Sequence, residues 1–499
     1  MLVTFAHEEG RAFTNQLSRV EQKKLGQFMT PPAIAQFMAR RLVVDVTLPL
    51  VRVLEPAAGA GILAAAVIDE LLSKPSLPER IELLMFEYDA RLVPGLKVLA
   101  GKMDEACRAK GVVLDWELVN SDFLLSEIAL SGQPVPGLLT ISNPPFFKLN
   151  KAFDERAKAH AYAVYGQPNI YSLFMAACAR LTPPDGRWCF ITPRSWMAGQ
   201  YFRAARQTML RCLTMDHLHA FESRREGFEE DAVLQETVIA WARGRATAAH
   251  DASILLTRSQ GAGDLDQAEV QNLPVDRVVG ADEHAMLSLP KGTVNPFEGW
   301  TSTLRTYGLE VSTGPVVAFR AARFIREHLV NGSVPLLWLQ HVGQQTVRWP
   351  VQKKREHIVA TAESAWMLVR NEPMVVMRRF SPKEDQRRVT CAAYEGQLPG
   401  AVIGLENHLN FVYRPGGSMT VDEARGLSAF LASTVVDDYF RALAGSTQVN
   451  ATELRRLPLP PLAVLKAIGA RLSVSPSLEA CDRAVANELG LMAAQERAA

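Results

Sequence analysis

The sequence predicts an α/β protein whose first half is a doubly wound, mostly parallel sheet with helices on both faces. Three observations lead to this fold class. β-Branched apolar runs alternate with helical patterns over the first half, and a glycine-rich turn follows the first of these runs. The alternation then fades after Arg245, which indicates a second domain of another kind.

Seven segments have the composition of buried strands, and the last two lie close together along the chain. Helices are predicted between them, for example over Ile62–Leu72 and Tyr171–Leu181. The predicted strands are Val51–Glu55, Ile81–Glu87, Trp116–Asp122, Leu138–Ser142, Arg187–Thr192, Met215–Phe221 and Glu236–Trp241.

The chain of 499 residues divides into four predicted parts. Residues 1–245 form the sheet domain, and residues 246–300, which mix Gly, Asp, Gln and Pro, form a linker. Residues 301–462 form a mixed α+β domain, and residues 463–499 form an Ala-rich helical tail. The tail is expected to serve in packing or in a weak dimer; otherwise the protein is expected to be a monomer.

Charge is unevenly distributed although the net charge is only +1. Residues 301–400 carry 14 Lys and Arg against 8 Asp and Glu, whereas the remainder carries 40 against 45. A basic segment on an otherwise neutral protein suits a nucleic-acid-facing domain, although solvated surfaces can look similar. No apolar stretch is long enough for a membrane span or a secretory signal, so a cytoplasmic protein is expected.

The six cysteines are scattered and form no C-x-x-C pair. This spacing favours reduced, packed thiols over a zinc site or a disulfide framework. No metal site is therefore expected.

The glycine-rich turn runs from the first strand into the helix that begins at Ile62. The small residues Ala57, Gly59 and Gly61 would allow a ligand to approach the backbone, and the start of the helix offers free N–H groups to a carboxylate. The turn opens with Glu55-Pro56 and has no phosphate-binding lysine. A cationic, amino-acid-like cofactor is therefore favoured over a nucleotide phosphate.

Acidic residues stand at the ends of the second and third strands. Glu87 could accept hydrogen bonds from both hydroxyls of a ribose, or it could be an ordinary loop carboxylate. Asp122 could accept from an adenine amine with Phe123 packed against the ring. The alternatives are a helix cap for Asp122 and core packing for Phe123.

The most specific motif is Asn143-Pro144-Pro145-Phe146, directly after the fourth strand. The prolines fix the backbone so that the Asn143 side-chain oxygen and the Pro144 carbonyl can accept both hydrogens of an exocyclic NH2 group. Its nitrogen lone pair then becomes available for methylation, while Phe146 stacks on the ring. A simple strand-ending turn is the alternative.

An adenine inside a duplex cannot reach such a site unless it rotates out of the base stack. A second aromatic side chain should then contact the extruded base. Phe228 is the predicted residue, and a loop aromatic that covers the core is the alternative.

Together these motifs resemble the γ-class adenine-N6 DNA methyltransferases of the TaqI type. The resemblance implies a seven-stranded, Rossmann-like domain that binds S-adenosylmethionine, followed by a target-recognition domain for double-stranded DNA. It implies that Thr30 and Pro31, within Gly26–Pro32, line the methionine part of the cofactor. It also assigns Glu55, Ala57, Gly59 and Gly61 to the methionine, Glu87 to the ribose, Asp122 and Phe123 to the adenine, and Asn143, Pro144, Pro145, Phe146 and Phe228 to the target base. Phe146 stands where many relatives have Tyr, and it should still stack.

Three later segments, Thr313-Gly314, Arg378–Arg388 and Ser446–Asn450, resemble modification methyltransferases of the PstI/BsuBI type. Those enzymes accompany a separate restriction endonuclease and methylate the adenine of CTGCAG. DNA contacts are expected from Arg378, Arg379, Lys383, Arg387, Arg388, Gln448 and Asn450. A solvated charged helix, or turn caps at Gln448 and Asn450, would explain the same residues.

The sequence thus predicts an S-adenosylmethionine-dependent, adenine-specific DNA methyltransferase of a type II restriction-modification system. RNA base-amine and protein-glutamine methyltransferases share the Asn-Pro-Pro motif, but they would not need a large basic recognition half. A non-catalytic DNA-recognition subunit is the alternative outside the enzymes. The intact motifs argue against it.

Overall fold

The computed structural model describes residues 2–17, 29–222, 236–246, 253–280, 283–291, 296–352, 355–381, 385–443 and 449–490. The chain forms two compact units, Met1–Thr293 and Val294–Ala499.

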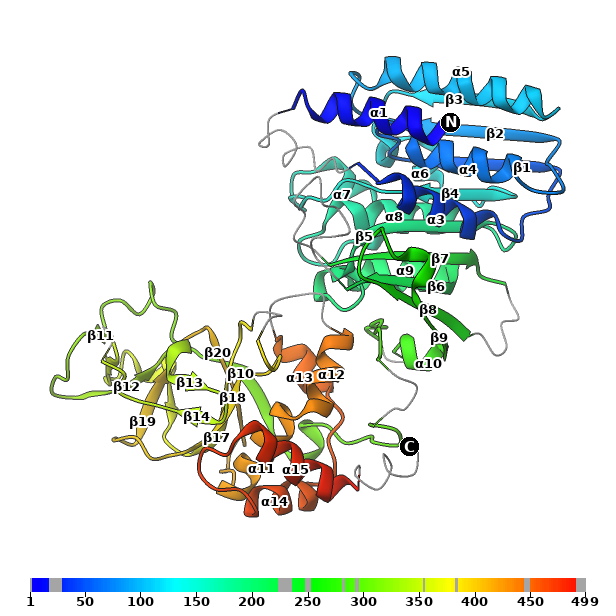
Figure 1. Cartoon of the computed structure of the whole chain (residues 1–499). Helices are drawn as coiled ribbons and strands as arrows, with labels where there is room; N and C mark the ends of the chain where they lie inside the picture. The colour runs from blue at the N-terminus through cyan, green and yellow to red at the C-terminus, as the bar shows by residue number, and fades with distance from the viewer. Residues whose placement is uncertain are drawn as a thin grey trace. The chain divides into compact units, whose positions relative to one another are not determined.

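The first unit is built on a nine-stranded sheet with the strand order β3-β2-β1-β4-β5-β7-β6-β8-β9 (Figure 1). Strands β1 to β5 are parallel, and β7 is antiparallel to both of its neighbours, β5 and β6. The first seven strands therefore form the predicted doubly wound, Rossmann-like sheet. The strands are β1 (Leu50–Glu55), β2 (Arg80–Phe86), β3 (Val113–Val119), β4 (Leu138–Ser142), β5 (Arg187–Pro193), β6 (Leu213–Phe221), β7 (Thr237–Gly244), β8 (Ser253–Ser259) and β9 (Glu269–Pro274).

Helices cover both faces of this sheet because successive strand residues point into two separate apolar cores. In β4, for example, Leu139 and Ile141 belong to one core and Leu138 to the other. The first core is shared with α1 (Leu2–Thr14), α3 (Pro32–Val43), α4 (Ile62–Leu72) and α5 (Val93–Ala109). The second is shared with α6 (Glu127–Ser131), α8 (Ile170–Leu181) and α9 (Arg203–Cys212).

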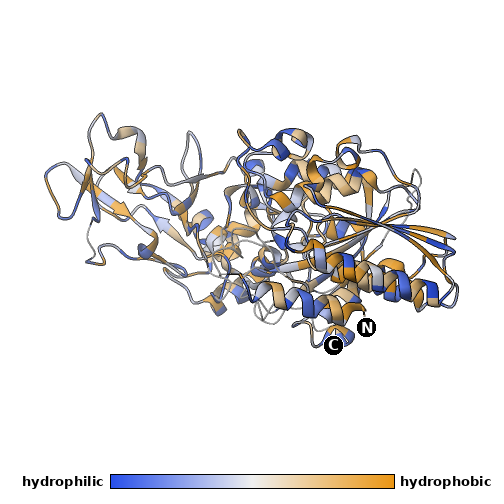
Figure 2. Cartoon of the chain, turned by 90° about the horizontal axis from the view of Figure 1, so that it is seen from above, coloured by the Kyte–Doolittle hydropathy of each residue, from blue (hydrophilic) through white to orange (hydrophobic). Residues whose placement is uncertain are grey.

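Figure 2, which colours the ribbon by hydropathy, shows helices that contain both hydrophilic and hydrophobic residues. Helix α1 adds to the first core through Leu2, Val3, Ala6 and Phe13. Two short helices complete the unit, α7 (Glu155–Ala159) and α10 (Val275–Val278).

The prediction that residues 246–300 form a linker is wrong for the central part of this range. Strand β8 pairs in parallel with β6, and β9 pairs antiparallel with β8, so both extend the sheet of the first unit. Strand β9 lies at the sheet edge and has mostly exposed or half-buried side chains. Such an edge strand lacks the continuous apolar run by which buried strands are recognised.

The second unit contains sheets of four, five and two strands. Their orders are β10-β20-β17-β18, β11-β15-β12-β19-β16 and β13-β14. The bounds are β10 (Glu310–Thr313), β11 (Ile325–Arg326), β12 (Ser333–Leu337), β13 (Val342–Gly343), β14 (Thr346–Val347), β15 (His357–Val359), β16 (Leu368–Arg370), β17 (Pro373–Arg378), β18 (Cys391–Glu395), β19 (Val402–Leu405) and β20 (Leu409–Tyr413).

Helices pack beside the four-stranded sheet of this second unit and share one apolar core with it. The predicted tail is helical, but α14 and α15 pack within this core, so it is an integral part of the unit. At the crossing of α11 and α14, a Cβ on Gly426 would lie only 1.7 Å from the Leu465 carbonyl oxygen, so this close approach requires glycine. The helices are α11 (Val421–Ala432), α12 (Thr434–Leu443), α13 (Ala451–Arg456), α14 (Leu462–Ala470) and α15 (Leu478–Leu489).

All six cysteines are free thiols, and five of them are buried. Among the described residues, no helix combines the length and apolar character needed to cross a membrane. The same residues contain no group of three or more His, Cys, Asp or Glu side chains arranged to hold a metal ion.

Candidate functional site

The predicted site residues of the first unit gather at one edge of its sheet. Strand β1 lies between β2 and β4 and is parallel to both. The segments that follow the carboxyl ends of these strands therefore meet at the same edge, as in other doubly wound sheets. Glu55 ends β1, Glu87 follows β2, and Asn143 follows β4.

The glycine-rich turn after β1 uses its two glycines differently. Both have positive φ angles, +56° at Gly59 and +79° at Gly61. A Cβ on Gly61 would lie 2.6 Å from a Leu99 methyl carbon, so this glycine is needed for packing against α5. A Cβ on Gly59 would meet only the Met29 sulfur, at 3.8 Å. Gly59 is thus the position where a ligand could approach the backbone.

Glu55 stabilises the helix that follows this turn. It is 1% exposed, and its Oε2 accepts a hydrogen bond from the backbone N–H of Ala64, 3.0 Å away in the first turn of α4. Burial raises the pKa of this carboxyl well above its usual value, and the neighbouring Glu87 raises it further. The predicted Glu-Pro turn therefore places a buried acid beside the start of the helix.

Glu87 connects the turn after β1 to the loop after β2. Its Oε2 accepts from the N–H of Gly59 at 2.7 Å, and its Oε1 accepts from the N–H of Asp89 at 2.7 Å. Burial raises the pKa of Glu87 to about 7, although both backbone hydrogen bonds lower it. Asn120, which the sequence analysis missed, holds this loop by donating to the Glu87 carbonyl at 2.7 Å.

Asp122 and Phe123 lie just beyond β3, which ends at Val119 rather than at the predicted Asp122. Asp122 caps a short 3-10 turn by accepting from the N–H of Leu124 at 3.0 Å. The Phe123 ring is 1% exposed and packs between Phe86 and Phe174, with ring centroids 5.3 and 5.6 Å away. The packing alternative for Phe123 is therefore observed, and its ring belongs to the core.

The Asn-Pro-Pro-Phe motif follows β4 without an intervening residue. Asn143 donates a hydrogen bond from its Nδ2 to the Thr30 Oγ1 at 3.0 Å. Thr30 is 3% exposed and comes two residues before α3, so it is a fixed partner. This bond defines the orientation of the Asn143 amide. The amide nitrogen of Asn143 is therefore turned toward Thr30.

Phe146 is half-buried and is supported by a second layer of aromatic rings. Its ring meets the edge of Tyr171 at 5.8 Å, and Tyr171 stacks on Phe202 at 5.4 Å. The Tyr171 hydroxyl forms a 2.8 Å hydrogen bond with the Ser195 hydroxyl. Tyr171 is fully buried in α8 and had no motif by which the sequence could identify it.

Phe228, Lys383 and Gln448 lie outside the described residues, so the structure does not place these predicted contacts.

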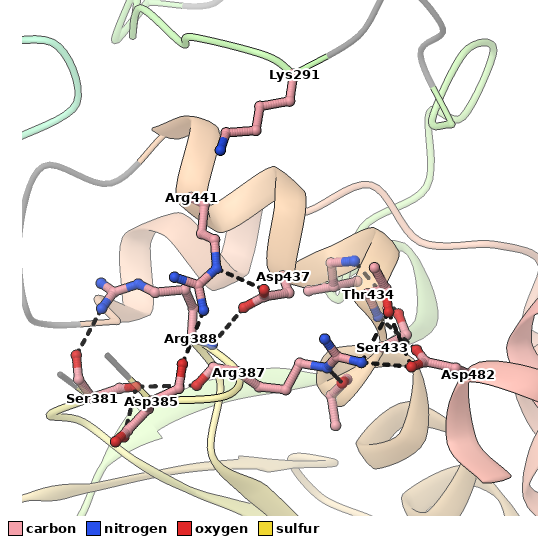
Figure 3. A network of polar contacts seen from close by, with 12 residues as sticks. Lys291, Ser381, Asp385, Arg387, Arg388, Ser433, Thr434, Asp437, Arg441 and Asp482 are labelled. Carbon is pink, nitrogen blue, oxygen red and sulfur yellow. Dashed lines mark hydrogen bonds and ion pairs between the residues drawn. The ribbon is translucent and has the colours of Figure 1, made fainter. Parts of the chain in front are cut away.

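The expected DNA contacts of Arg387 and Arg388 do not agree with their packing in the second unit (Figure 3). Arg388 is 3% exposed, its Nη1 donates to the Ser381 carbonyl at 2.7 Å, and its N–H donates to Asp437 at 2.6 Å. Arg387 pairs with Asp482 at 2.5 Å. Both guanidinium groups thus stabilise the unit internally, which a charge pattern alone cannot reveal.

Asn450 forms a helix cap, the alternative noted for this residue. It begins α13 in a reciprocal capping box with Glu453, whose Oε2 accepts from the Asn450 N–H at 3.1 Å. Arg378 ends β17 and donates to the Val342 carbonyl at 2.6 Å. Arg378 and Arg379 are both half-buried, so part of each side chain remains accessible.

The sequence of the chain is similar to known modification enzymes over most of its length. It is 31% identical over 477 residues to the type II methyltransferase M.BsuBI of Bacillus subtilis, which covers 93% of this chain and 92% of that protein. It is 28% identical to the type II methyltransferase M.PstI of Providencia stuartii, over 90% of this chain and 89% of that protein.

Two further comparisons concern a segment of the first unit and most of the chain. Residues 139–228 match the family model of the Eco57I restriction-modification methylase. This segment begins in β4 and contains the Asn-Pro-Pro-Phe motif. The solved structure of the type IIG restriction endonuclease BpuSI aligns with 93% of this chain and 65% of that chain, at a TM-score of 0.43 and 12% identity.

Proposed function

Because the chain belongs to the type II methyltransferase family, we propose that it transfers a methyl group from S-adenosylmethionine to the N6 amine of adenine in double-stranded DNA. The observation that carries this proposal is the hydrogen bond from Asn143 to Thr30, which orients the amide at the end of β4. It supports an amine substrate because the opposite side of that amide is a hydrogen-bond acceptor.

The target-base site is formed by the motif and its aromatic support. The Asn143 Oδ1 and the Pro144 carbonyl accept the two hydrogens of the adenine amine, which holds the nitrogen and directs its lone pair out of the ring plane. Phe146 stacks on the base, and the contact with Tyr171 holds the Phe146 ring in place. Both sets of contacts act by positioning, and no covalent intermediate with the protein is required.

The residues at the sheet edge fit S-adenosylmethionine. Gly59 leaves room beside the backbone, α4 begins without a side-chain cap, and the acids Glu55 and Glu87 are buried close together. Neighbouring buried acids favour a cationic ligand such as a sulfonium. Glu87 would hold the ribose and Asp122 the adenine amine, and the bound cofactor supplies the activated methyl group.

The second unit would supply target recognition. Its basic segment, residues 301–400, fits the electrostatics of a DNA-binding surface. Within Arg378–Arg388, Arg387 and Arg388 are engaged inside the unit. Arg378 and Arg379 therefore remain as the proposed DNA contacts among the described arginines of this segment. The base would have to leave the duplex to reach Asn143, with Phe228 as the proposed second aromatic contact.

The extended similarity to M.BsuBI and M.PstI supports a role in a restriction-modification system. We propose that the chain acts in the cytoplasm, accompanies a separate restriction endonuclease, and recognises a CTGCAG-like palindrome. Single-molecule sequencing of DNA from cells that express the protein tests the reaction and the target together. The expected result is N6-methyladenine at one palindromic sequence; methylated cytosine, or no methylated DNA base beside a methylated RNA or protein, would refute it.

Thr30→Val tests the role of Thr30 in orienting Asn143. Valine has a similar shape but cannot accept the hydrogen bond, and one such bond contributes about 0.5–1.5 kcal/mol, which corresponds to a roughly three- to tenfold decrease in kcat. Steady-state kinetics should show this decrease with little change in the KM for S-adenosylmethionine. Thr30→Ser should restore kcat. A raised KM with an unchanged kcat would instead indicate that Thr30 only lines the cofactor.

The pKa of Glu87, about 7, predicts pH-dependent cofactor binding. The ionised carboxylate accepts from both ribose hydroxyls, whereas the protonated form has lost one acceptor site. Affinity should therefore rise by about tenfold between pH 6 and pH 8 as Glu87 ionises. Calorimetric titration with S-adenosylhomocysteine at the two pH values measures this change in affinity.

Glu87→Gln should bind more weakly and show a flatter pH profile. Glu117→Gln, which changes an exposed glutamate of β3, should retain the slope of the unmodified protein. A flat profile in the unmodified protein would contradict the ribose role of Glu87.

A further inference from the structure

Arg156 lies in the first turn of α7, in the segment that follows the Asn-Pro-Pro-Phe motif, and is held by one carboxylate. Asp154 caps α7 by accepting from the Arg156 N–H at 3.0 Å. Its two oxygens also accept from Arg156 Nε at 2.9 Å and Nη2 at 2.6 Å. Asp154, by this hydrogen bonding, raises the pKa of the Arg156 guanidinium. Such a two-point chelate fixes the plane of the guanidinium.

The remaining nitrogen of this guanidinium reaches Asp122, in the segment just beyond β3. Arg156 Nη1 lies 3.5 Å from Asp122 Oδ2, while the other oxygen of Asp122 accepts from the N–H of Leu124 at 3.0 Å. The side chains of Arg156 and Asp122 are 24% and 16% exposed, so both are largely shielded from water. Interactions between charges are weakened less there than on an open surface.

The same guanidinium also contacts the loop that carries the target-base motif. Its central carbon lies 5.6 Å from the centre of the Phe147 ring, and Phe147 directly follows Phe146. The Phe147 carbonyl in turn accepts from the N–H of Ile170 at 2.9 Å, at the start of α8. Arg156 therefore connects the loop after β4 with the proposed adenine end of the cofactor site.

We propose that Arg156 is a positioning residue that fixes the Asp122 carboxylate for the adenine amine of the cofactor. The inference rests on the proposed function, because it takes Asp122 as the acceptor for that amine. With one oxygen held by Leu124 and the other aligned by Arg156, the carboxylate is already ordered before the ligand arrives. Cofactor binding then costs less conformational entropy of the Asp122 side chain.

The chain offers a matched control for this arrangement. Arg91 chelates Asp89 through the same atoms, with Nε at 2.9 Å, Nη2 at 2.6 Å and its N–H at 3.0 Å from the carboxylate. This pair is 53% and 11% exposed and lies in the loop after β2. Arg156, by contrast, also reaches Asp122. Arg91→Ala thus removes an equivalent chelate without removing the contact between Arg156 and Asp122.

The test compares two ligands that differ at position 6 of the purine and in the hydrogen on the adjacent N1. S-adenosylhomocysteine carries the amine, and S-inosylhomocysteine carries a carbonyl oxygen in its place. Calorimetric dissociation constants for both are measured with the full chain and with Arg156→Ala, Asp122→Asn, the double variant and Arg91→Ala. The preference is the ratio of the two dissociation constants, inosyl over adenosyl.

We expect Arg156→Ala to lower this preference about three- to tenfold, the range of one hydrogen bond. The preference of the double variant should then be nearly the same as that of Asp122→Asn alone, because Arg156 acts through Asp122. Arg91→Ala should leave the preference within twofold of the unmodified protein. An unchanged preference in Arg156→Ala, or fully additive losses in the double variant, would overturn the proposal.

Two further results separate this inference from its premise. If the unmodified protein binds neither ligand, the proposed cofactor is wrong; if it binds both equally, the adenine role of Asp122 is wrong. Should Arg156→Ala fail to fold, Arg156→Lys provides the same measurement. Lysine keeps the charge but cannot chelate Asp154 while reaching Asp122, so the preference must again fall.

Discussion

Replacing Asn143 by alanine is expected to lower kcat by about a hundredfold or more, the effect of removing one preorganised group that acts on the reacting atoms. The variant loses the oxygen that would accept from the adenine amine, and Thr30 loses its partner. Cofactor binding should persist because Glu55, Glu87 and Gly59 remain joined to the backbone by their own hydrogen bonds. Single-turnover methylation and calorimetric titration measure the two properties separately.

Asn150→Ala is the matched control for this experiment. Asn150 is an exposed asparagine in the same loop, and its side-chain oxygen accepts from the nearby N–H of Ala152. Its loss should leave kcat within about twofold, as expected for a surface substitution. If Asn143→Ala methylated at the normal rate, the assigned amine chemistry would be wrong.

Two buried histidines in β6 are expected to contribute a loss of about 4 kcal/mol in the stability of the first unit between pH 7.5 and pH 5, which the raised pKa of Glu87 opposes in part. His217 contacts the Thr257 hydroxyl at 2.7 Å, and His219 contacts the same hydroxyl at 2.8 Å and Ser259 at 3.1 Å. Burial lowers the pKa of His217 to about 3 and that of His219 to about 4. Both rings are therefore neutral in the folded protein at pH 5.

The direction follows from the proton balance. An unfolded histidine has a pKa near 6.5, so below this pH the unfolded chain binds protons that the folded chain does not. The contribution of the histidines to stability is complete above about pH 6.5 and falls as the pH approaches 4, with a loss of about 2 kcal/mol per histidine at pH 5.

Urea unfolding at the two pH values measures this loss. The single variants His217→Gln and His219→Gln should each remove about 2 kcal/mol of acid-induced destabilisation, whereas His328→Gln, at an exposed position of the second unit, should not. If both single variants kept the pH dependence of the unmodified protein, these rings would not be buried in their neutral form.

Much of the first unit could be predicted from the sequence because its central strands are buried on both faces. Strand β4 and helix α4 begin and end at the predicted residues, since both are almost entirely buried and are bounded by turn residues. Strand β3 begins and ends three residues earlier than predicted. Its exposed outer side chains, among them Trp116, make its ends less distinct.

The candidate site residues could be proposed from the sequence where they directly follow predicted strands. The turn after β1, Glu87 and the Asn-Pro-Pro-Phe motif do so, and the structure brings them to one edge of the sheet. Contacts between distant segments could not be inferred in this way. Tyr171 supports Phe146 from α8, a mostly apolar helix in which nothing distinguishes this residue, and Arg156 reaches Asp122 across 34 positions.

Charge patterns failed for a different reason. A run such as Arg387-Arg388 has the same composition whether its side chains face a polyanion or the interior of the fold. Here the Arg388 guanidinium donates to the Ser381 carbonyl while its backbone N–H donates to the buried Asp437, and Arg387 pairs with Asp482. The distinction depends on helices α12 and α15, which come later in the chain.

The two additional strands β8 and β9 set the minimum length of any recombinant fragment of the catalytic half. Ending a fragment at residue 245, the predicted boundary, would remove both strands and turn β6 into an open edge with a row of unpaired backbone groups. His217 and His219 would lose their hydroxyl partners at the same time. Such an edge promotes aggregation. A fragment that continues to residue 291 keeps this part of the sheet paired.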